Sequence, residues 1–541
     1  MPYLLRFLPD GCQWRGEQPS PLAIAAAECG ILLEQPCGGK AVCGKCRVRV
    51  AGGELPAGEG DHRILGPADV AAGWRLACRA VAAADALVEV PPASRTVARK
   101  SFGPDRLFAA GFEPCYPGGG WGIALDLGST TLAAALVDLA TGALAASASA
   151  LNPQVHYGGD VISRIAFARE HEHGGRELHR LMLAGVTGLV RECAAAASVP
   201  PGQLRALVAA GNPTRTHTLL GLGVHGLGEA PFQGERYAAW GGSAPMLGLE
   251  LPPGTDAWVL PGVATHVGGD AVAAVLATGL DVSERPRLLI DLGTNTEVVL
   301  GSRDGLICTS AAAGPAFEGA VIAYGMRAVP GAIDRVSLAG DDLEISVIGD
   351  EQPVGLCGSG LIDAVAALLQ GGVLEPSGRI RERGELTALP ASLRDRVVDA
   401  ADGRRVRLGG SDERPVFLTA ADVRELQLVK ASIAAAVQLL LERSGTRAED
   451  VAAVYLAGAF GGTIREASAR AIGLLPLPDA PVEFVGNAAG AGARLALVDR
   501  RARARAERIA ALARVVELAT DPAYHEAFVA ALAFPQPDTQ A

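Results

Sequence analysis

The sequence is poor in aromatic residues and has no excess of positive charge. Aromatic residues make up 4% of the 541 residues, and 59 acidic side chains outnumber 48 basic ones, which gives a net charge of −11. This sign argues against a protein that binds nucleic acid through its overall charge. Hydrophobic residues (49%) and charged residues (20%) occur at ordinary globular levels, which excludes extensive disorder.

The sequence also lacks a secretory signal and a long uninterrupted hydrophobic run. Residues 1–10 show no basic region followed by an apolar stretch and a cleavage site. The best candidate for a membrane span, residues 131–151, is interrupted by Asp138 and Thr141, so an alanine-rich hairpin is the better interpretation. We therefore expect a cytoplasmic protein that does not bind membranes.

The distribution of cysteine separates the first ninety residues from the rest. Six of the ten cysteines precede Arg79, and the strand and helix signals of residues 1–90 suit a small α+β domain. Residues 91–120 are rich in proline and glycine and are interpreted as a linker or a small connecting element that lets the first domain move. At about 150 residues per domain, the remaining length predicts further large domains.

The chain after residue 120 contains two similar halves. Apolar strands at 123–125 and 288–290 lead into the related stretches that begin at Asp126 and Asp291. Two further pairs of stretches follow in the same order, 206–212 with 454–461 and 262–270 with 483–487. This repetition predicts two α/β lobes, residues 121–284 and 285–541, that face each other across a cleft.

Four cysteines of the first domain have the spacing of an iron–sulfur site. The pattern is Cys-x5-Cys-x2-Cys with a fourth cysteine about thirty residues later, at Cys37, Cys43, Cys46 and Cys78. Four thiolates complete the ligand set of a two-iron cluster, although the first gap is one residue longer than in plant-type proteins. Structural zinc is the alternative, but zinc ribbons pair two Cys-x2-Cys motifs. Cys12 and Cys29 fall outside the pattern and are interpreted as buried apolar residues.

This region resembles the two-iron ferredoxins. The resemblance runs through residues 30–31, 37–39, 43–46 and 75–78. It implies a β-grasp fold, a [2Fe-2S] cluster and the transfer of one electron at a time.

Each repeated half carries a candidate phosphate loop. A strand ends at Asp126 or Asp291, whose carboxylate can hold Mg²⁺ directly or through water. The glycine that follows lets backbone N–H groups approach phosphate closely. The candidate nucleotide-binding residues of the two loops are Gly128, Ser129, Thr130, Thr131, Gly293, Thr294 and Asn295. One loop alone is weak evidence, whereas two loops on matching lobes could hold the two ends of a triphosphate.

Other candidate residues are less specific. Gly458 and Gly461 lie in a glycine-rich stretch that offers exposed backbone to a nucleoside. Glu297 is a third catalytic candidate beside the two loop aspartates. Glu297, Asp160 and Asp270 could position water or metal, and each could equally be a capping or turn residue.

The paired loops resemble those of the acetate and sugar kinase, heat-shock protein and actin superfamily of ATPases, abbreviated ASKHA. This resemblance implies two RNase H-like lobes of the actin type, ATP with Mg²⁺, and an adenosine loop at residues 457–462.

The whole chain resembles the ATP-dependent reductive activators of corrinoid proteins. The resemblance runs through residues 126–131, 211–214, 356–363 and 458–461. It implies an enzyme, a reductive activase that returns a corrinoid from Co(II) to Co(I) by one electron, and a homodimer. No histidine has an aspartate two residues before it, as the Asp-x-His-x-x-Gly motif of cobalamin carriers requires, so the corrinoid is expected on a partner protein. An external reductase or ferredoxin is expected to supply the electron, because no dinucleotide or flavin motif follows a predicted strand.

Three alternatives remain open from the sequence. A ferredoxin-fused small-molecule kinase would use the same phosphate loops. An activator of a radical dehydratase would also couple ATP to electron transfer, but it needs cluster ligands between the ATPase lobes, and no suitable cysteines follow Cys78. A partner-binding module would hold ATP without turnover.

Overall fold

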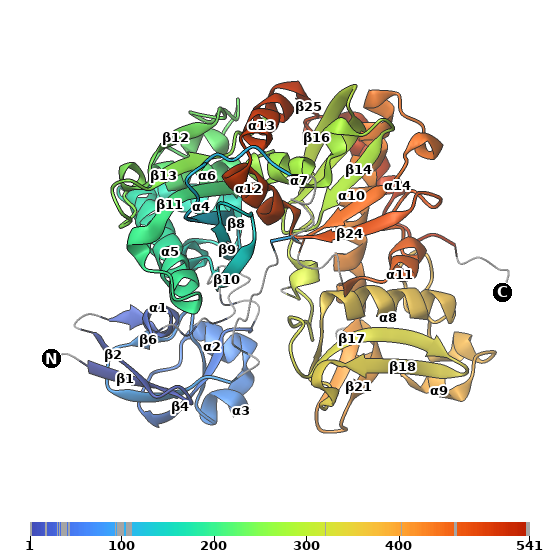
Figure 1. The fold of residues 1–541 in the computed structure, drawn as a ribbon. Coiled ribbons are helices and arrows are strands. Elements are labelled where there is room, and N and C mark those ends of the chain that lie inside the picture. The colour runs from blue at the N-terminus through green and yellow to red at the C-terminus, as the bar shows by residue number, and fades with distance from the viewer. Residues whose placement is uncertain are drawn as a thin grey trace. The chain divides into compact units, whose positions relative to one another are not determined.

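The computed structural model describes residues 3–16, 19–29, 31, 33, 41, 44–91, 94, 102–103, 111–319, 321–401, 403–458 and 463–536. The chain divides into two compact units, Met1–Asp270 with Ala489–Glu507 and Ala271–Ala488 with Arg508–Ala541. Their helices and strands are labelled along the chain in Figure 1.

The N-terminal domain is built on a five-stranded sheet with the order β2-β1-β7-β4-β5. Strand β1 pairs antiparallel with β2 and parallel with β7. Tyr3, Leu5 and Phe7 of β1 are buried because alternate side chains of a strand point to the same face. The elements are β1 (Tyr3–Leu8), β2 (Cys12–Gly16), β3 (Ser20–Pro21), α1 (Leu22–Glu28), β4 (Arg47–Gly53), α2 (Glu59–Ile64), α3 (Gly66–Ala71), β5 (Trp74–Leu76), β6 (Val81–Ala82) and β7 (Ala86–Glu89). The predicted α+β domain of β-grasp type is confirmed.

Cys12 and Cys29 are joined in a disulfide. The bond ties the first residue of β2 to the residue that follows α1. The interpretation of these two cysteines as buried apolar residues is therefore wrong. The pairing could not be deduced from the sequence, because spacing alone does not determine disulfide connectivity.

The first lobe contains a six-stranded sheet with the order β10-β9-β8-β11-β13-β12. Strands β8, β9 and β10 form an antiparallel meander, and β8 pairs in parallel with β11. Strand β8 is almost completely buried, as expected for a central strand that is covered on both faces. The strands are β8 (Trp121–Leu127), β9 (Thr131–Asp138), β10 (Leu144–Leu151), β11 (Leu204–Gly211), β12 (Trp240–Ser243) and β13 (Asp256–Val259). The helices are α4 (Val161–Glu170), α5 (Gly174–Ala196) and α6 (Pro213–Leu220). Helix α7 (Gly269–Thr278) follows, and most of its residues belong to the second unit.

The second lobe has a sheet with the order β24-β23-β14-β15-β16-β25, whose first five strands repeat the connectivity of the first sheet. Its first three strands again form an antiparallel meander, and β14 pairs in parallel with β23. The sixth strands differ, since β12 pairs with β13 and β25 pairs with β16. The strands are β14 (Arg287–Asp291), β15 (Thr296–Ser302), β16 (Gly305–Ala311), β23 (Val454–Ala457), β24 (Val482–Gly486) and β25 (Ala513–Val515). The predicted fold class, a duplicated α/β fold of ASKHA type, is confirmed. The third matched pair was misaligned, because the strand equivalent to β24 is β13 and not the glycine-rich stretch 262–270.

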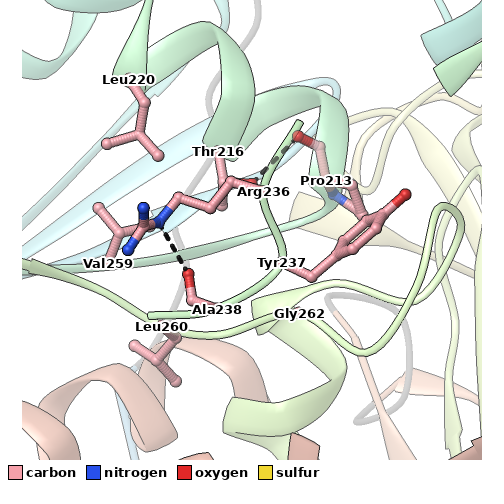
Figure 2. Close-up of a pocket in the computed structure, with 9 residues that line it drawn as sticks. All are labelled: Pro213, Thr216, Leu220, Arg236, Tyr237, Ala238, Val259, Leu260 and Gly262. Atoms are coloured by element: carbon pink, nitrogen blue, oxygen red, sulfur yellow. Dashed lines mark hydrogen bonds between the residues drawn. The ribbon is translucent and has the colours of Figure 1, made fainter. Parts of the chain in front are cut away.

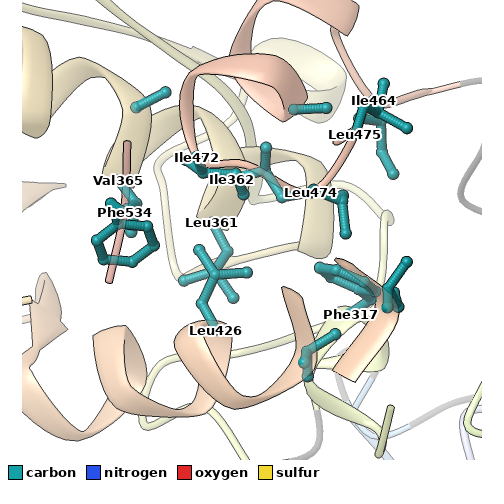
Figure 3. Packing of buried hydrophobic residues seen from close by; sticks show 14 of the residues in the cluster. Phe317, Leu361, Ile362, Val365, Leu426, Ile464, Ile472, Leu474, Leu475 and Phe534 are labelled. Carbon is teal, nitrogen blue, oxygen red and sulfur yellow. The ribbon is translucent and has the colours of Figure 1, made fainter. Parts of the chain in front are cut away.

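Two small three-stranded sheets and several helices complete the second lobe. The sheets have the orders β18-β17-β19 and β20-β21-β22. Their strands are β17 (Ala332–Ala339), β18 (Asp342–Val347), β19 (Gly355–Leu356), β20 (Val397–Ala400), β21 (Gly403–Gly410) and β22 (Pro415–Thr419). The helices are α8 (Gly358–Gln370), α9 (Ala391–Asp395), α10 (Ala420–Ser444), α11 (Glu466–Ala471) and α14 (Pro522–Ala530). Figure 3 shows Leu361 and Ile362 of α8 in the same apolar cluster as Leu426 of α10.

The end of the expected linker is part of the first unit. Helices α12 (Ala488–Val498) and α13 (Arg500–Leu512) adjoin it. The backbone N–H of Cys115 donates to the Val498 carbonyl over 2.8 Å, and that of Arg500 donates to the Glu113 carbonyl over 2.8 Å. These two hydrogen bonds connect the end of the expected connecting segment to α12 and α13.

The alanine-rich stretch 131–151 forms the β9–β10 hairpin, as interpreted from the sequence. Within the described ranges, none of the helices has both the length and the apolar character that crossing a membrane requires.

The buried carboxylate of Asp61 holds the strand that leads to Cys78. Its two oxygens accept hydrogen bonds from the backbone N–H of Leu76, over 2.6 Å, and of Gly58, over 2.8 Å. Asp61 is 2% exposed, so water cannot replace these bonds in the folded domain. The carboxylate thereby links α2 to β5.

We expect Asp61→Ala to lower the free energy of unfolding of this domain by about 1–3 kcal/mol, because two backbone donors lose their partner. Urea unfolding followed by tryptophan fluorescence measures the change. Asp69→Ala is the matched control, since Asp69 is exposed and lies 3.8 Å from Arg47. Equal losses in the two variants would contradict the structural role of Asp61.

Candidate functional site

The structure describes two of the four predicted cluster cysteines. Cys46 is 1% exposed and Cys78 is half-buried. The backbone N–H of Ala77 donates to the Cys46 carbonyl over 2.9 Å, which places these two cysteines on neighbouring stretches of backbone. Cys37 and Cys43 lie outside the described residues.

The described part of the cysteine loop requires glycine. Gly44 has φ +68°, and a Cβ atom added there would lie 3.1 Å from Cγ2 of Ile64. Only glycine adopts this left-handed conformation at little cost. The left-handed Gly44 and the neighbouring backbone positions of Cys46 and Cys78 fit a cluster enclosed by a glycine-bearing loop.

Asp126 lies at the carboxyl end of β8, next to the loop that the sequence predicts to bind phosphate. It is 4% exposed and pairs with Ala133 of β9 and Ala210 of β11. Gly128, Ser129 and Thr130 follow it as a half-buried loop, and Thr131 begins β9.

Hydrogen bonds hold all three carbonyl groups of this loop. The Asn152 side chain donates to the Gly128 carbonyl over 3.0 Å, and its backbone N–H donates to the Thr130 carbonyl over 2.8 Å. Nη2 of Arg164 donates to the Ser129 carbonyl over 2.6 Å. The side chains of Asn152 and Arg164, which were not predicted from the sequence, therefore hold the carbonyl groups of the loop in place.

Asn152 and Arg164 belong to a fully buried polar network. The Asn152 side chain accepts from the backbone N–H of Gln154 over 3.0 Å. Oε1 of Gln154 accepts from both Arg164 and Arg215, each over 3.3 Å. All four side chains are 0% exposed. No sequence pattern marked Gln154, Arg164 or Arg215, because only the fold brings them together.

Asp160 caps helix α4. Its two oxygens accept from the backbone N–H of Ser163, over 2.7 Å, and from the Ser163 hydroxyl, over 2.8 Å. Asp160 also raises the pKa of Arg215, as does Asp270, although burial is the dominant effect and lowers that pKa to about 10. Both carboxylates thus lie near the buried guanidinium groups.

The second-lobe loop begins in the same way as the first. Asp291 ends β14 and pairs with Ala457 of β23 and with Glu297 of β15. Residues opposite each other in an antiparallel pair project from the same face, so Asp291 and Glu297 are neighbours. Glu297 is 8% exposed and accepts a 3.4 Å hydrogen bond from the Ser310 hydroxyl.

Gly458 lies directly against this loop. Its φ is +98°, and a Cβ atom added there would overlap the Leu292 carbonyl oxygen and lie 3.2 Å from Oδ1 of Asp291. The predicted adenosine loop and the second phosphate loop are therefore adjacent at Gly458. Gly461 and the other residues of 459–462 lie outside the described residues.

The rest of the second loop is tied to a carboxylate that was not predicted. The Thr294 hydroxyl donates to Oε1 of Glu318 over 2.8 Å. The Thr294 carbonyl accepts from the backbone N–H of Gly314 over 2.9 Å. A Cβ atom added at Gly293 would lie 2.9 Å from the Asn295 carbonyl oxygen, so the turn is tight.

A pocket lies elsewhere on the first lobe, beside α6. Figure 2 shows the Arg236 side chain extended across it, with Nε 3.2 Å from the Ala238 carbonyl oxygen. None of the site residues predicted from the sequence lines this pocket. Its lining residues are Pro213, Thr216, Leu220, Arg236, Tyr237, Ala238, Val259, Leu260 and Gly262.

Known protein families match the three parts of the chain. Residues 9–83 match the 2Fe-2S iron-sulfur cluster binding domain, 121–283 the RACo middle region, and 285–541 the C-terminal domain of RACo, the ASKHA domain. The corrinoid activation enzyme RamQ of Eubacterium limosum is 35% identical over 417 residues, which cover 76% of this chain and 69% of the relative.

The chain belongs to the family of corrinoid reductive activators. Its relatives include the [Co(II) methylated amine-specific corrinoid protein] reductase of Methanosarcina barkeri, which is 26% identical over 70% of each chain. A solved structure, titled reductive activator for corrinoid, iron-sulfur protein, superposes with a TM-score of 0.69 at 28% identity and covers 98% of both chains. The recognition of this family from the sequence is confirmed.

We expect Gly458→Ala to destabilise this family member more than Gly445→Ala. Both glycines have positive φ, which costs alanine about 1–2 kcal/mol. Only Gly458 adds overlap with neighbouring backbone, worth about 1–3 kcal/mol more, because nothing lies within 4 Å of a Cβ at Gly445. Thermal unfolding compares the two variants. Equal shifts in Tm would show that the backbone around Gly458 relaxes to make room for the added Cβ atom, which would contradict the prediction.

We expect His156 to make the first lobe sensitive to acid. Burial, helped by the charge of Arg164, lowers its pKa from 6.5 to about 4. The unfolded chain binds the proton at the higher pH, so stability is lost as the pH falls from about 6.5 to 4.

As the pH falls from about 6.5 to 4, we expect the free energy of unfolding to decrease by about 1–3 kcal/mol more in the wild type than in His156→Gln. Unfolding measured across this pH range tests the difference. His225→Gln is the control because His225 is exposed. A wild type and a His156→Gln variant with the same pH profile would contradict the prediction.

Proposed function

We propose that this protein returns the corrinoid of a partner protein from Co(II) to Co(I) by one electron in an ATP-dependent step. The observation that carries the proposal is the agreement over 98% of both chains with the reductive activator for corrinoid, iron-sulfur protein. A cluster domain and an ASKHA domain occur together on this single chain. This combination suits an enzyme that couples nucleotide turnover to electron transfer.

We assign Cys37, Cys43, Cys46 and Cys78 as the ligands of the [2Fe-2S] cluster. The spacing of the four thiols and the adjacent positions of Cys46 and Cys78 support this assignment. The bound cluster supplies one electron at a time. The Ala77–Cys46 hydrogen bond and the Asp61 carboxylate would hold this side of the ligand set in place.

We assign the loops that follow Asp126 and Asp291 to ATP with Mg²⁺. Each carboxylate could hold Mg²⁺ directly or through water at its own loop, and the glycine and hydroxyl residues of each loop would contact phosphate. Gly458 keeps the backbone beside Asp291 free of a side chain, as a nucleotide contact requires. Glu297 would orient water or metal beside Asp291, since the two residues pair across β14 and β15.

The coupling of ATP to electron transfer depends on how differently the two nucleotide states bind the partner protein. ATP can favour reduction of the corrinoid only as far as the two nucleotide states differ in their affinity for the partner protein. Altered axial ligation of the cobalt on the partner is one route for this effect. A homodimer in the cytoplasm, supplied with electrons by an external reductase or ferredoxin, completes the proposal.

The test mixes anaerobically reduced protein with a Co(II) corrinoid protein encoded near its gene and records absorbance spectra with and without Mg-ATP. We expect Co(I) to form only with ATP. Asp291→Ala should slow its formation by about 100-fold, the loss that follows removal of one preorganised electrostatic contact.

Asp304→Ala is the matched control. Asp304 is exposed in the turn between β15 and β16 of the same lobe, so its removal should leave the rate unchanged. The absence of Co(I) with every candidate corrinoid protein, despite an intact cluster spectrum and bound ATP, would contradict the proposal. Release of ADP that depends on a sugar or carboxylate acceptor would favour a kinase instead.

A further inference from the structure

Arg215 is a buried cation with unused hydrogen-bond donors. It is 0% exposed, and its one hydrogen bond from the guanidinium goes from Nη1 to Oε1 of Gln154 over 3.3 Å. Its Nε and Nη2 atoms are shielded from solvent and have no partner among the described residues. A buried donor without a partner costs about 1–3 kcal/mol, so an unused pair requires an explanation.

The two unused nitrogens form one edge of the planar guanidinium. This edge presents two parallel N–H donors, the arrangement that binds two oxygens of a phosphoryl group or carboxylate. Arg164, in the same network, differs because all three of its nitrogens donate, to the Gly158 and Ser129 carbonyls and to Gln154. The open edge is therefore specific to Arg215.

The position of Arg215 is set by close packing at the carboxyl ends of β8 and β11. A Cβ atom added at Gly211 would lie 2.9 Å from Cβ of Leu127 and 3.3 Å from Cβ of Arg215. A Cβ atom at Gly268 would lie 2.6 Å from the Gly211 carbonyl oxygen and would overlap Asn212. Two glycines thus allow the first turn of α6 to approach the end of β8.

The hydrogen-bond network connects this arginine to the candidate phosphate loop. Gln154 binds Arg215 and Arg164, Arg164 binds the Ser129 carbonyl, and Asn152 binds Gly128. Parallel strands of an α/β sheet bind ligands at their carboxyl ends. This connection favours a phosphoryl group over a carboxylate.

We propose that the Nε–Nη2 edge of Arg215 is an oxyanion-binding site for a phosphoryl group in the first lobe. The phosphoryl group has two possible sources, free inorganic phosphate or the terminal phosphate of a bound nucleotide. The second source rests on the proposed function, whereas the first does not. Because the edge is shielded from solvent, binding requires a small movement of neighbouring backbone and should be slower than the collision rate.

Burial lowers the pKa of Arg215 to about 10, with Asp160 and Asp270 acting in the opposite direction. The guanidinium therefore stays charged at neutral pH. The two carboxylates limit the net positive charge, so the fixed directions of the donors, more than charge alone, would select the ligand.

The test measures calorimetric binding of inorganic phosphate, Mg-ADP and a nonhydrolysable Mg-ATP analogue to the full-length protein. Arg215→Lys keeps the charge and removes the forked edge. If free phosphate is the ligand, we expect the variant to weaken phosphate binding at least tenfold. If the terminal phosphate of the nucleotide is the ligand, we expect it to lower the ratio of ATP-analogue to ADP affinity at least tenfold. Arg205→Gln is the control, because Arg205 is exposed at the amino-terminal end of the same strand, β11.

Gln154→Glu provides a second variant that keeps the shape of the side chain. Its carboxylate would bind Arg215 internally, so it should abolish phosphoryl binding. The variant also loses the 2.8 Å hydrogen bond from Nε2 of Gln154 to the Leu178 carbonyl, so Tm is measured to confirm that the protein is folded at the assay temperature. Loss of free-phosphate binding alone identifies inorganic phosphate as the ligand, and loss of only the preference for the ATP analogue identifies the terminal phosphate.

The proposal is overturned if the wild type shows no saturable phosphate binding and neither variant changes the ratio of ATP-analogue to ADP affinity. Arg215 would then bind a buried water and serve only the structure of the lobe. Failure of the corrinoid assay would leave both binding measurements interpretable, because neither uses a corrinoid or nucleotide turnover.

Discussion

Parallel pairing of the first and fourth strands in each lobe is the constraint on which the candidate nucleotide site depends. The β14–β23 ladder places Asp291 beside Ala457, and the β8–β11 ladder places Asp126 beside Ala210. Parallel strands end at the same edge of a sheet, so residues that are distant in sequence become neighbours there. The glycine at position 458 then lets the backbone approach the carboxylate of the loop.

The loops that follow Asp126 and Asp291 occupy equivalent positions in the two lobes but form hydrogen bonds with different side chains. In the first lobe, the carbonyl groups of the loop are held by amide and guanidinium donors from Asn152 and Arg164. In the second lobe, a threonine hydroxyl of the loop donates to the carboxylate of Glu318. The two loops are therefore held by different groups, donors to backbone carbonyls in the first lobe and a carboxylate acceptor in the second.

The N-terminal domain depends on a different kind of restraint. A disulfide, a buried carboxylate and a backbone hydrogen bond restrict the segments that surround the cysteine loop. A redox site benefits from this rigidity, since a ligand set that moves little on reduction needs little reorganisation. Each of the two lobes has its own apolar core.

The sequence by itself determined the β-grasp and ASKHA fold classes, the duplication and the family, because these leave local signals such as the cysteine spacing and the repeated aspartate–glycine turns. It also marked Asp126, Asp291 and Gly458, which lie at the ends of strands or directly after them. Only the tertiary structure decided that Asp160 caps a helix, that Cys12 bonds to Cys29, and that Gln154 joins two buried arginines. These contacts link side chains whose local sequence is ordinary, and their energies depend on burial and direction, which exist only once the chain has folded.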